Sequence, residues 1–461
     1  MADQRQSAGA EALAWEVCKL LDAGREREMH CARTHGALTA LTALAAGPVD
    51  GAAADLPRRS TQVAALRALL AACALPCNRA YLLLCNHAAA LAATTLPAAV
   101  GAARKLRRQD GVAVRGPDAA GPGDALLLPL LKLLRLIIAT PPPAESAHRM
   151  RADLVTLLLY SGGLHSLQDH CTSLSATPEQ AADHQPLLLQ YVALVHSLLL
   201  PLRASAHCSC AAPLRAFLQE AGVSGCMGIA CSILCEGAGQ DAQARSAALP
   251  APMLEVCRSV VLLLVHLGSL DAPYLRRVLG GGELKVQTLH LAHLTLQMCE
   301  GAHERASGLL HDVLLLLALF ALGSRANSEV LRWRWRGHPT MLHRLCALPF
   351  PYFCEARLRA ILMPTLVCGC LHDAANLRIL SSRLSAEHLR RFLREQLRLQ
   401  AAAAVAPCTD LSPAAVLIAD PSELPIVSLD YSLACRLPPA MWSEALAFFE
   451  AARPPTPPAA A

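Results

Sequence analysis

The 461-residue sequence contains little lysine, few aromatic residues and few β-branched side chains. Aromatic residues make up 4% of the chain, and only four of its 41 basic residues are lysine. Alanine and leucine supply most of an apolar content of 54%. Because alanine, leucine and arginine all favour helices, this composition predicts an all-α protein.

The sequence also lacks the motifs that bind nucleotides or carry hydrolytic chemistry. It contains no G-x-G-x-x-G, Walker-type, G-x-S-x-G or H-E-x-x-H segment. The glycine run at 280–282 lacks the preceding strand that a phosphate-binding loop needs, and no pair of acidic residues suggests acid–base chemistry. We therefore expect no catalytic residue, no cofactor and no enzymatic activity.

The 19 cysteines do not form the regular framework of a small disulfide-rich protein. One cluster has the composition of a metal site, but it begins with a C-x-C pair and continues at helical spacing instead of showing two C-x-x-C pairs. Its members are His207, Cys208, Cys210, Cys226, Cys231 and Cys235. Buried thiols and loop residues explain this pattern better than zinc does, so no metal is expected. An enzyme that uses the cluster remains an alternative to a non-enzymatic binding protein.

The amino terminus lacks the basic region and apolar run of a signal peptide, so a reducing, cytoplasmic location is expected. Three apolar stretches are candidates for a membrane span: 80–103, 125–139 and 313–322. The first is rich in alanine and polar residues, the second carries Lys132 and Arg135, and the third is too short. The sequence therefore predicts no integral membrane span.

Loops and prolines divide the chain into helical parts. The predicted parts are an N-terminal helical segment at 1–108, a flexible loop at 109–124, a helical-stack domain at 125–400, an irregular strap at 401–428, a C-terminal docking helix at 429–452 and a disordered tail at 453–461. Helices of 12–20 residues joined by short polar loops favour an irregular armadillo- or HEAT-like α-solenoid or multi-helix stack. A single-core irregular helical bundle is the alternative.

In two segments the spacing of apolar residues indicates which side of the predicted helix is buried. Leucines and other apolar residues recur at helical spacing throughout 307–322 and leave little polar surface, which predicts a helix at the centre of the stack. The segment 388–399 carries an apolar stripe that includes Leu389, Phe392 and Leu393, beside a stripe of arginines. An R-x-L match to cyclin-docking peptides at 391–393 is discounted because two of its side chains face the apolar stripe.

Positive charge is concentrated in residues 331–400, which hold twelve arginines and four acidic residues, a net charge of +8 against +5 for the whole chain. A one-sided basic block predicts an acidic partner, often nucleic acid. The binding residues we predict there are Arg332, Trp333, Arg334, Trp335, Arg336, Arg344, Arg390, Arg391, Arg394 and Arg398. Arginine can pair with phosphates and tryptophan can stack on bases.

Both basic clusters also have a purely structural interpretation. In residues 332–336 the tryptophans would pack while the arginines are solvated at a helix end. The cluster of Arg104, Lys105, Arg107 and Arg108 would stabilise the carboxyl end of its own helix.

The carboxyl-terminal half resembles a known family. A G-H-P-T segment begins at Gly337 and is followed by L-P-F-P-Y-F at 348–353, an R-L…P-x-L helix at 357–366, and a closing D-Y…W…F segment at 430–449. This pattern resembles the C-terminal helical region of the S-phase cyclin A-associated protein in the endoplasmic reticulum family. The residues that carry it are His338, Pro339, Pro349, Phe350, Tyr352, Phe353, Trp442 and Phe449, and we expect most of them to be structural, with Pro349, Phe350 and Phe353 filling a corner between helices.

The resemblance implies a non-enzymatic adaptor that is cytoplasmic and associated with the endoplasmic reticulum. It implies docking on ribosomes together with a tetratricopeptide adaptor, in the co-translational decay of tubulin messenger RNA by a deadenylase complex. The basic block would then face ribosomal RNA or another acidic ribonucleoprotein surface. The alternative that the resemblance implies is a protein–protein scaffold of the cyclin A–kinase or ciliary kind, without nucleic-acid contact.

Overall fold

The structure is a computed structural model. It describes residues 36–47, 56–110, 124–140, 145–175, 178–204, 209–237, 249–300, 307–335, 337–405 and 430–451. Within these ranges the chain forms helices and turns and no strand, so the predicted all-α fold is confirmed. Residues outside the described ranges include Arg336, most of the predicted loop and strap, the predicted tail and residues 1–35.

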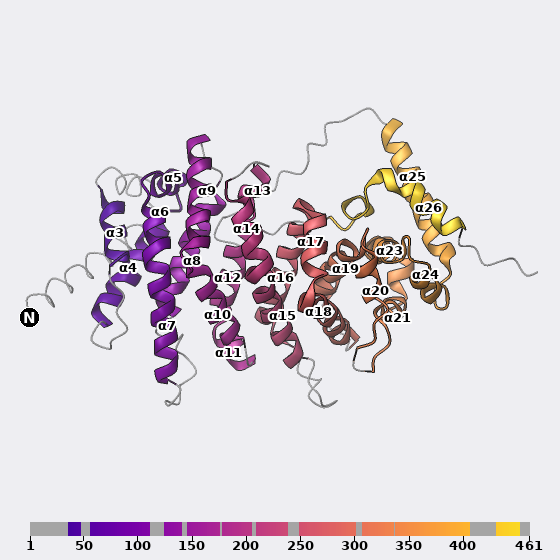
Figure 1. Ribbon diagram of the computed structural model, residues 1–461, viewed down its shortest axis with the longest axis horizontal. Helices are drawn as coiled ribbons and strands as arrows, with labels where there is room; N and C mark the ends of the chain where they lie inside the picture. The colour runs from indigo at the N-terminus through magenta and orange to yellow at the C-terminus, as the bar shows by residue number, and fades with distance from the viewer. Residues whose placement is uncertain are drawn as a thin grey trace, which may run out of the picture. The chain divides into compact units, whose positions relative to one another are not determined.

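The chain divides into two compact units, and the boundary falls inside helix α15, between Ser232 and Ile233. The described carboxyl-terminal residues 430–451 belong to the second unit. In each unit, helices that follow one another in the sequence lie side by side (Figure 1).

The helices of the first unit form a succession in which α3, α4, α8 and α12 each contact the next, while α7 and α9 pack on α10. A chain of such neighbour contacts is the arrangement of a stack. The bounds are α3 (Ala37–Ala45), α4 (Leu56–Ala72), α5 (Pro76–Leu84), α6 (His87–Ala90), the π-helical turn η2 (Leu91–Thr95), α7 (Leu96–Asp110), α8 (Asp124–Ala139), α9 (Glu145–Tyr160), α10 (Gly163–Leu174), α11 (Pro178–Asp183), α12 (Gln185–Ser197), α13 (Leu200–Ala204), α14 (Ala211–Phe217), the π-helical turn η3 (Leu218–Gly222) and α15 (Val223–Gly237).

The second unit is built around α19, which packs between α16 and α23; α25 follows on α23, and α26 on α25. The bounds are α16 (Ala251–Leu270), α17 (Ala272–Leu279), α18 (Gly282–Glu300), α19 (Ser307–Ala321), α20 (Arg325–Val330), α21 (Met341–Cys346), α22 (Pro351–Cys354), α23 (Ala356–Cys370), α24 (Ala374–Ser381), α25 (Ala386–Val405), the 3-10 turns η6 (Leu433–Cys435) and η7 (Pro439–Met441), and α26 (Trp442–Ala451). As the leucine pattern predicted, nearly every side chain of α19 is buried.

Side-chain caps define where several helices of the second unit begin. The side chains of Asp271, Ser324, Thr340 and Asp373 each accept a hydrogen bond from a backbone N–H in the first turn of α17, α20, α21 and α24. Those N–H groups have no partner inside the helix, so each cap is worth about 1 kcal/mol. The capping residues therefore explain why short helices of six to eight residues persist here.

Buried polar bonds hold the C-terminal segment, residues 430–451, on the second unit. The Tyr431 hydroxyl donates to Asp312, which is fully buried in α19. The Arg436 guanidinium, 2% exposed, reaches α23 and donates to the carbonyl of Ile361 at 2.8 Å and to the hydroxyl of Thr365 at 2.7 Å. In α26, Trp442 and Phe449 are buried, as the sequence predicted for a docking helix.

Candidate docking surface on helix α25

Helix α25 presents arginines beside a buried apolar stripe. Leu389, Phe392 and Leu393 are buried in the second unit, as the sequence predicted. Side chains three or four positions apart share a helix face, so Arg391, Arg394 and Arg398 lie together. Burial of the apolar stripe therefore fixes which way these arginines point.

These arginines line a hollow of about 490 Å³, which we call the α25 hollow. It is lined by Arg359, Glu387, Arg391, Arg394, Glu395 and Arg398, so four positive and two negative groups meet there. Arg359 comes from α23, and the sequence analysis did not include it among the binding residues. Among the described residues, this hollow is where members of the predicted basic stripe converge.

Half of the positive charge in the α25 hollow is already neutralised. Arg359 pairs with Glu395 at 2.8 Å, and Arg394 pairs with Glu387 at 3.0 Å and with Glu450 of α26 at 2.7 Å. Hydrogen bonds from Arg390 and then Arg394 lower the pKa of Glu387, so this carboxylate stays charged. Arg391 and Arg398 are exposed, and no ion pair joins either of them to a described residue.

Three of the arginines that were predicted to bind a partner form ion pairs or hydrogen bonds within the fold. Arg332 pairs with Asp373 at 2.8 Å, and Asp373 also caps α24. Arg344 is 7% exposed and donates to the carbonyl and the ring of His293, both at 2.9 Å. Arg390 is 8% exposed and donates to Glu387 and to the carbonyl of Phe449.

The side chains of Arg332, Arg344 and Arg390 are therefore engaged within the fold, and the prediction that they bind a partner stays a prediction. A charge count records each arginine but not the group that it meets in the fold. The carbonyl and imidazole that hold Arg344 are 51 residues away in the sequence.

The two tryptophans of the predicted Arg–Trp run have different surroundings. Trp333 is 39% exposed, and the Lys285 ammonium lies 5.0 Å from its ring centre. Trp335 is half-buried against His290, with ring centres 4.6 Å apart. Arg334 is exposed, and Arg336 lies outside the described residues. The Trp335 ring thus packs within the fold, which agrees with the structural interpretation of this residue.

In the family pattern, Phe350 does not fill a corner between helices, so that expectation is corrected. Its side chain is 76% exposed, and Pro349, His338 and Pro339 are exposed as well. Phe350 is the residue before the one-turn helix α22, and Tyr352, two positions on, points inward instead. The Tyr352 hydroxyl lies 2.9 Å from His311 Nε2, and Phe353 is half-buried.

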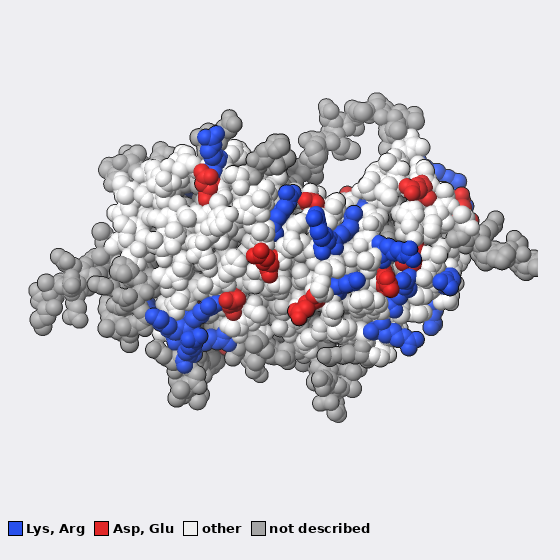
Figure 2. All heavy atoms as spheres, in the orientation of Figure 1, with Lys and Arg blue, Asp and Glu red and all other residues white. Residues whose placement is uncertain are grey.

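Two of the four basic side chains in the cluster of the first unit make contacts within the fold, while Lys105 and Arg108 are exposed. Figure 2 shows basic side chains gathered over the lower end of α7. Arg104 pairs with Asp169 at 3.3 Å, and Arg107 donates to the Ser173 hydroxyl at 2.6 Å and to the Ser173 carbonyl at 2.9 Å. These two arginines therefore stabilise the neighbouring helix α10 instead of the end of their own helix.

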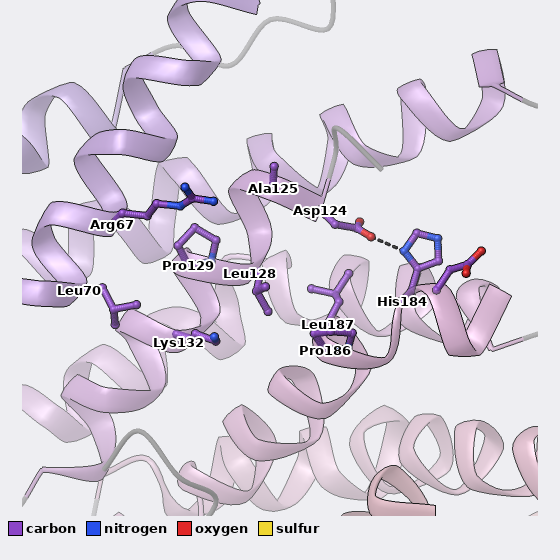
Figure 3. A pocket seen from close by; sticks show the side chains of 11 residues that line it. Arg67, Leu70, Asp124, Ala125, Leu128, Pro129, Lys132, His184, Pro186 and Leu187 are labelled. Carbon is purple, nitrogen blue, oxygen red and sulfur yellow. Dashed lines mark hydrogen bonds and ion pairs between the residues drawn. The ribbon is translucent and has the colours of Figure 1, made fainter. Parts of the chain in front are cut away.

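A second hollow, of about 290 Å³, lies in the first unit and has a floor of leucine and proline side chains (Figure 3). Asp124 at the first turn of α8 and His184 before α12 point toward each other and are hydrogen-bonded (Figure 3). His170 Nε2 of α10 lies 3.8 Å from the other oxygen of Asp124. Neither the composition nor the spacing of these residues suggested this contact, because Asp124, His170 and His184 are far apart in the sequence.

Because of the carboxyl group of Asp124, the free energy of unfolding should fall at low pH. Burial alone raises its pKa, but hydrogen bonds and charge from His170 and His184 outweigh burial and hold the pKa at about 2, below the ordinary 3.8. The unfolded chain therefore binds this proton more readily, and the stabilisation is complete above pH 3.8 and is lost as the pH falls toward 2. We expect Asp124→Asn to cost about 2 kcal/mol in urea unfolding at neutral pH.

The matched control for this prediction is Asp183→Asn, because Asp183 lines the same hollow and is exposed. It should change the free energy of unfolding by less than about 0.5 kcal/mol. If Asp124→Asn retained the wild-type loss of stability between pH 4 and pH 2, the role given to Asp124 would be wrong.

Three described members of the cysteine–histidine cluster lie on α15, and Cys210 lies just before α14. Cys210, Cys226 and Cys231 are buried, and burial raises the pKa of the Cys226 thiol to about 12. Cys235 is exposed and lies 3.4 Å from His290. In the part of the chain that the structure describes, no three histidine, cysteine or acidic side chains are placed to hold a metal; His207 and Cys208 lie outside that part.

Three helical stretches are long and apolar enough to cross a membrane, judged by length and composition. They are Gln185–Leu202, Ala211–Cys235 and Ala251–Leu270, and the bent pair Pro76–Leu84 and His87–Arg108 would be a fourth. The expectation of no integral membrane span is therefore not supported. Two of these stretches contain charged residues, such as Arg215 and Arg258, and the helices continue through them.

Comparison with known proteins gives a distant relative. No family model matches this chain. The human S phase cyclin A-associated protein in the endoplasmic reticulum is 29% identical over 182 residues, which is 39% of this chain. The matched segment covers 12% of that protein. The match supports a distant relation, and the name of the human protein describes it as associated with cyclin A in the endoplasmic reticulum.

Proposed function

We propose that this chain is a non-enzymatic adaptor that docks on an acidic ribonucleoprotein surface, the ribosome above all, through the α25 hollow. The observation that carries the proposal is the pair of exposed arginines, Arg391 and Arg398, beside two arginines already held in ion pairs. Two guanidinium groups on one helix face, held in place by the buried stripe beneath them, suit neighbouring phosphates of structured RNA.

Family resemblance extends the proposal to the remaining partners. A tetratricopeptide adaptor and a deadenylase complex would join the chain to tubulin messenger RNA decay, and the location would be the cytoplasm or the surface of the endoplasmic reticulum. The distant human relative supports an adaptor or scaffold role and leaves these finer steps to experiment.

Charge reversal of the two exposed arginines tests the docking surface. We expect the double variant Arg391→Glu, Arg398→Glu to have at least tenfold lower affinity for purified ribosomes, measured by co-sedimentation. The slope of log affinity against log salt should fall by about 2, because two phosphate contacts are lost. Arg344 is unsuitable for this test, since a buried glutamate at that position would disrupt folding.

The matched control is Arg325→Glu with Arg378→Glu, which makes the same change in net charge at two exposed arginines that do not line the α25 hollow. Equal weakening by both double variants would indicate non-specific attraction. Undiminished binding by the Arg391 and Arg398 variant would rule out this docking surface.

A protein–protein scaffold is the second candidate, and the exposed ring of Phe350 supports it. A largely exposed phenylalanine between prolines is the kind of side chain that anchors a partner. The R-x-L match gives no support to cyclin docking, because Phe392 and Leu393 are 4% and 0% exposed. Association that survives nuclease and is lost in Phe350→Ala would favour the scaffold over the ribosome.

A further inference from the structure

A third hollow, in the second unit, is lined by two arginines and no acidic residue. Its volume is about 350 Å³. It is lined by Pro273, Arg276, Arg277, Gly280, Gly323, Ser324 and Asn327, and we call it the α17 hollow. Basic side chains are visible over α17 in Figure 2. The positive charge here is therefore not balanced from within the site, unlike that of the α25 hollow.

The fold holds the two arginines in place from beneath. Tyr274, Leu275, Val278 and Leu279 anchor the other side of α17 in the core. The carboxyl end of α17 does not need the arginines as a cap. The carbonyl of residue 276 already accepts hydrogen bonds from the Asn327 amide at 3.0 Å and from the backbone N–H of Gly280 at 2.9 Å.

Arg276 is half-buried, and its Nε donates to the carbonyl of Leu319 at 3.2 Å. Its Nη1 lies 3.4 Å from the position that a Cβ would take on Gly323, which adopts a φ of +68°. One edge of the guanidinium is thus tied down while the other faces the turn at 323–324. Burial lowers the pKa of Arg276, because the charged form is less stable when it is partly removed from water.

The Ser324 hydroxyl adds a hydrogen-bond donor to the same hollow. Its oxygen accepts from the backbone N–H of Asn327 at 3.3 Å, so its proton is left to donate elsewhere. Arg277 is exposed and completes the lining. Two adjacent positive groups and a hydroxyl, with no acidic residue in the lining, form an arrangement that an oxyanion would stabilise.

We propose that the α17 hollow binds a phosphate monoester carried on a serine or threonine of a partner protein. Such a group bears a charge close to −2 at neutral pH, which matches two guanidinium groups, and its three oxygens accept forked hydrogen bonds. Each phosphodiester of RNA bears a single charge, and no aromatic side chain lines this hollow to stack a base. The phosphorylated protein is therefore the favoured ligand, and the site is independent of the α25 hollow.

The test uses the full chain and a degenerate peptide library with a fixed central phosphoserine, followed by fluorescence anisotropy. We expect the unphosphorylated library to bind at least tenfold more weakly. Arg277→Gln should weaken phosphopeptide binding at least tenfold, Arg277→Lys by less, and the control Arg378→Gln, at an exposed arginine outside both hollows, by less than twofold. Because Arg277 is exposed, both of its variants should keep the wild-type melting temperature.

Three results would overturn the inference. Equal binding of both libraries would remove the phosphate dependence, and unchanged binding by Arg277→Gln would place the site elsewhere. Displacement of the peptide by free phosphoserine at equal concentration, or by a single-stranded RNA of equal charge, would exclude a phosphorylated protein as the ligand. Because ribosome docking is tested separately, by sedimentation of the Arg391 and Arg398 variant, and the two hollows share no residue, failure here is distinguishable from failure of ribosome docking.

Discussion

Replacing Arg258 by alanine is expected to destabilise the second unit by about 3 kcal/mol. Arg258 Nε lies 2.7 Å from Asp312, whose carboxylate is fully buried at the centre of the helical stack. Removing the guanidinium leaves a buried negative charge with the Tyr431 hydroxyl as its remaining partner among the contacts described here. An uncompensated buried charge costs more than the ion pair contributes, so the loss should exceed that of a surface ion pair several-fold.

Urea unfolding followed by circular dichroism measures this loss. The double variant Arg258→Ala, Asp312→Asn should be only about 1 kcal/mol less stable than wild type, because it also removes the unpaired buried charge. Arg325→Ala, at an exposed arginine of the same unit, is the control and should stay within about 0.5 kcal/mol of wild type. A double variant less stable than Arg258→Ala alone would contradict this account of Asp312.

Replacing Arg436 by methionine should release the C-terminal segment. Methionine has a similar length but no donor, so the carbonyls of Ile361 and Tyr431 and the hydroxyl of Thr365 lose the guanidinium that they share. Burial lowers the pKa of Arg436 to about 10, so the charge is present at neutral pH and is bonded on several sides. We expect a loss of about 3 kcal/mol, from three buried hydrogen bonds to a charged group.

Hydrogen exchange and limited proteolysis at residues 430–451 measure this release. Arg436→Lys should lie between wild type and Arg436→Met, because lysine keeps the charge without the planar fork. Cys435→Ala is the neighbouring control, since Cys435 is exposed. If the segment stayed protected in Arg436→Met, apolar packing by Trp442 and Phe449 would be sufficient to hold it.

The predictions from sequence succeeded where one helix carries the whole signal. The leucines of α19 and the apolar stripe of α25 repeat every three to four residues, so burial follows from a pattern within a single element. The same local spacing, with Glu387 three and seven positions before Arg390 and Arg394, could also have revealed the ion pairs that occupy the predicted basic stripe.

Other features depend on partners that no local pattern contains. Arg344 meets His293, and Asp124 meets His184, across 51 and 60 residues of sequence, so neither contact could be inferred from spacing. Phe350 was expected inside because phenylalanine is usually buried, but the start of α22 turns Tyr352 inward in its place. Charge counts located the basic region, and only the fold separates its structural arginines from the exposed ones.

The bonds from the C-terminal segment to α19 and α23 also set an order of events during synthesis. Tyr431 and Arg436 are translated after α25, yet they form hydrogen bonds with groups on helices made much earlier. A nascent chain halted before residue 430 would carry a stack whose centre still lacks these donors. A stop codon just before position 430 should therefore yield a short-lived product, even though every helix up to α25 has been made.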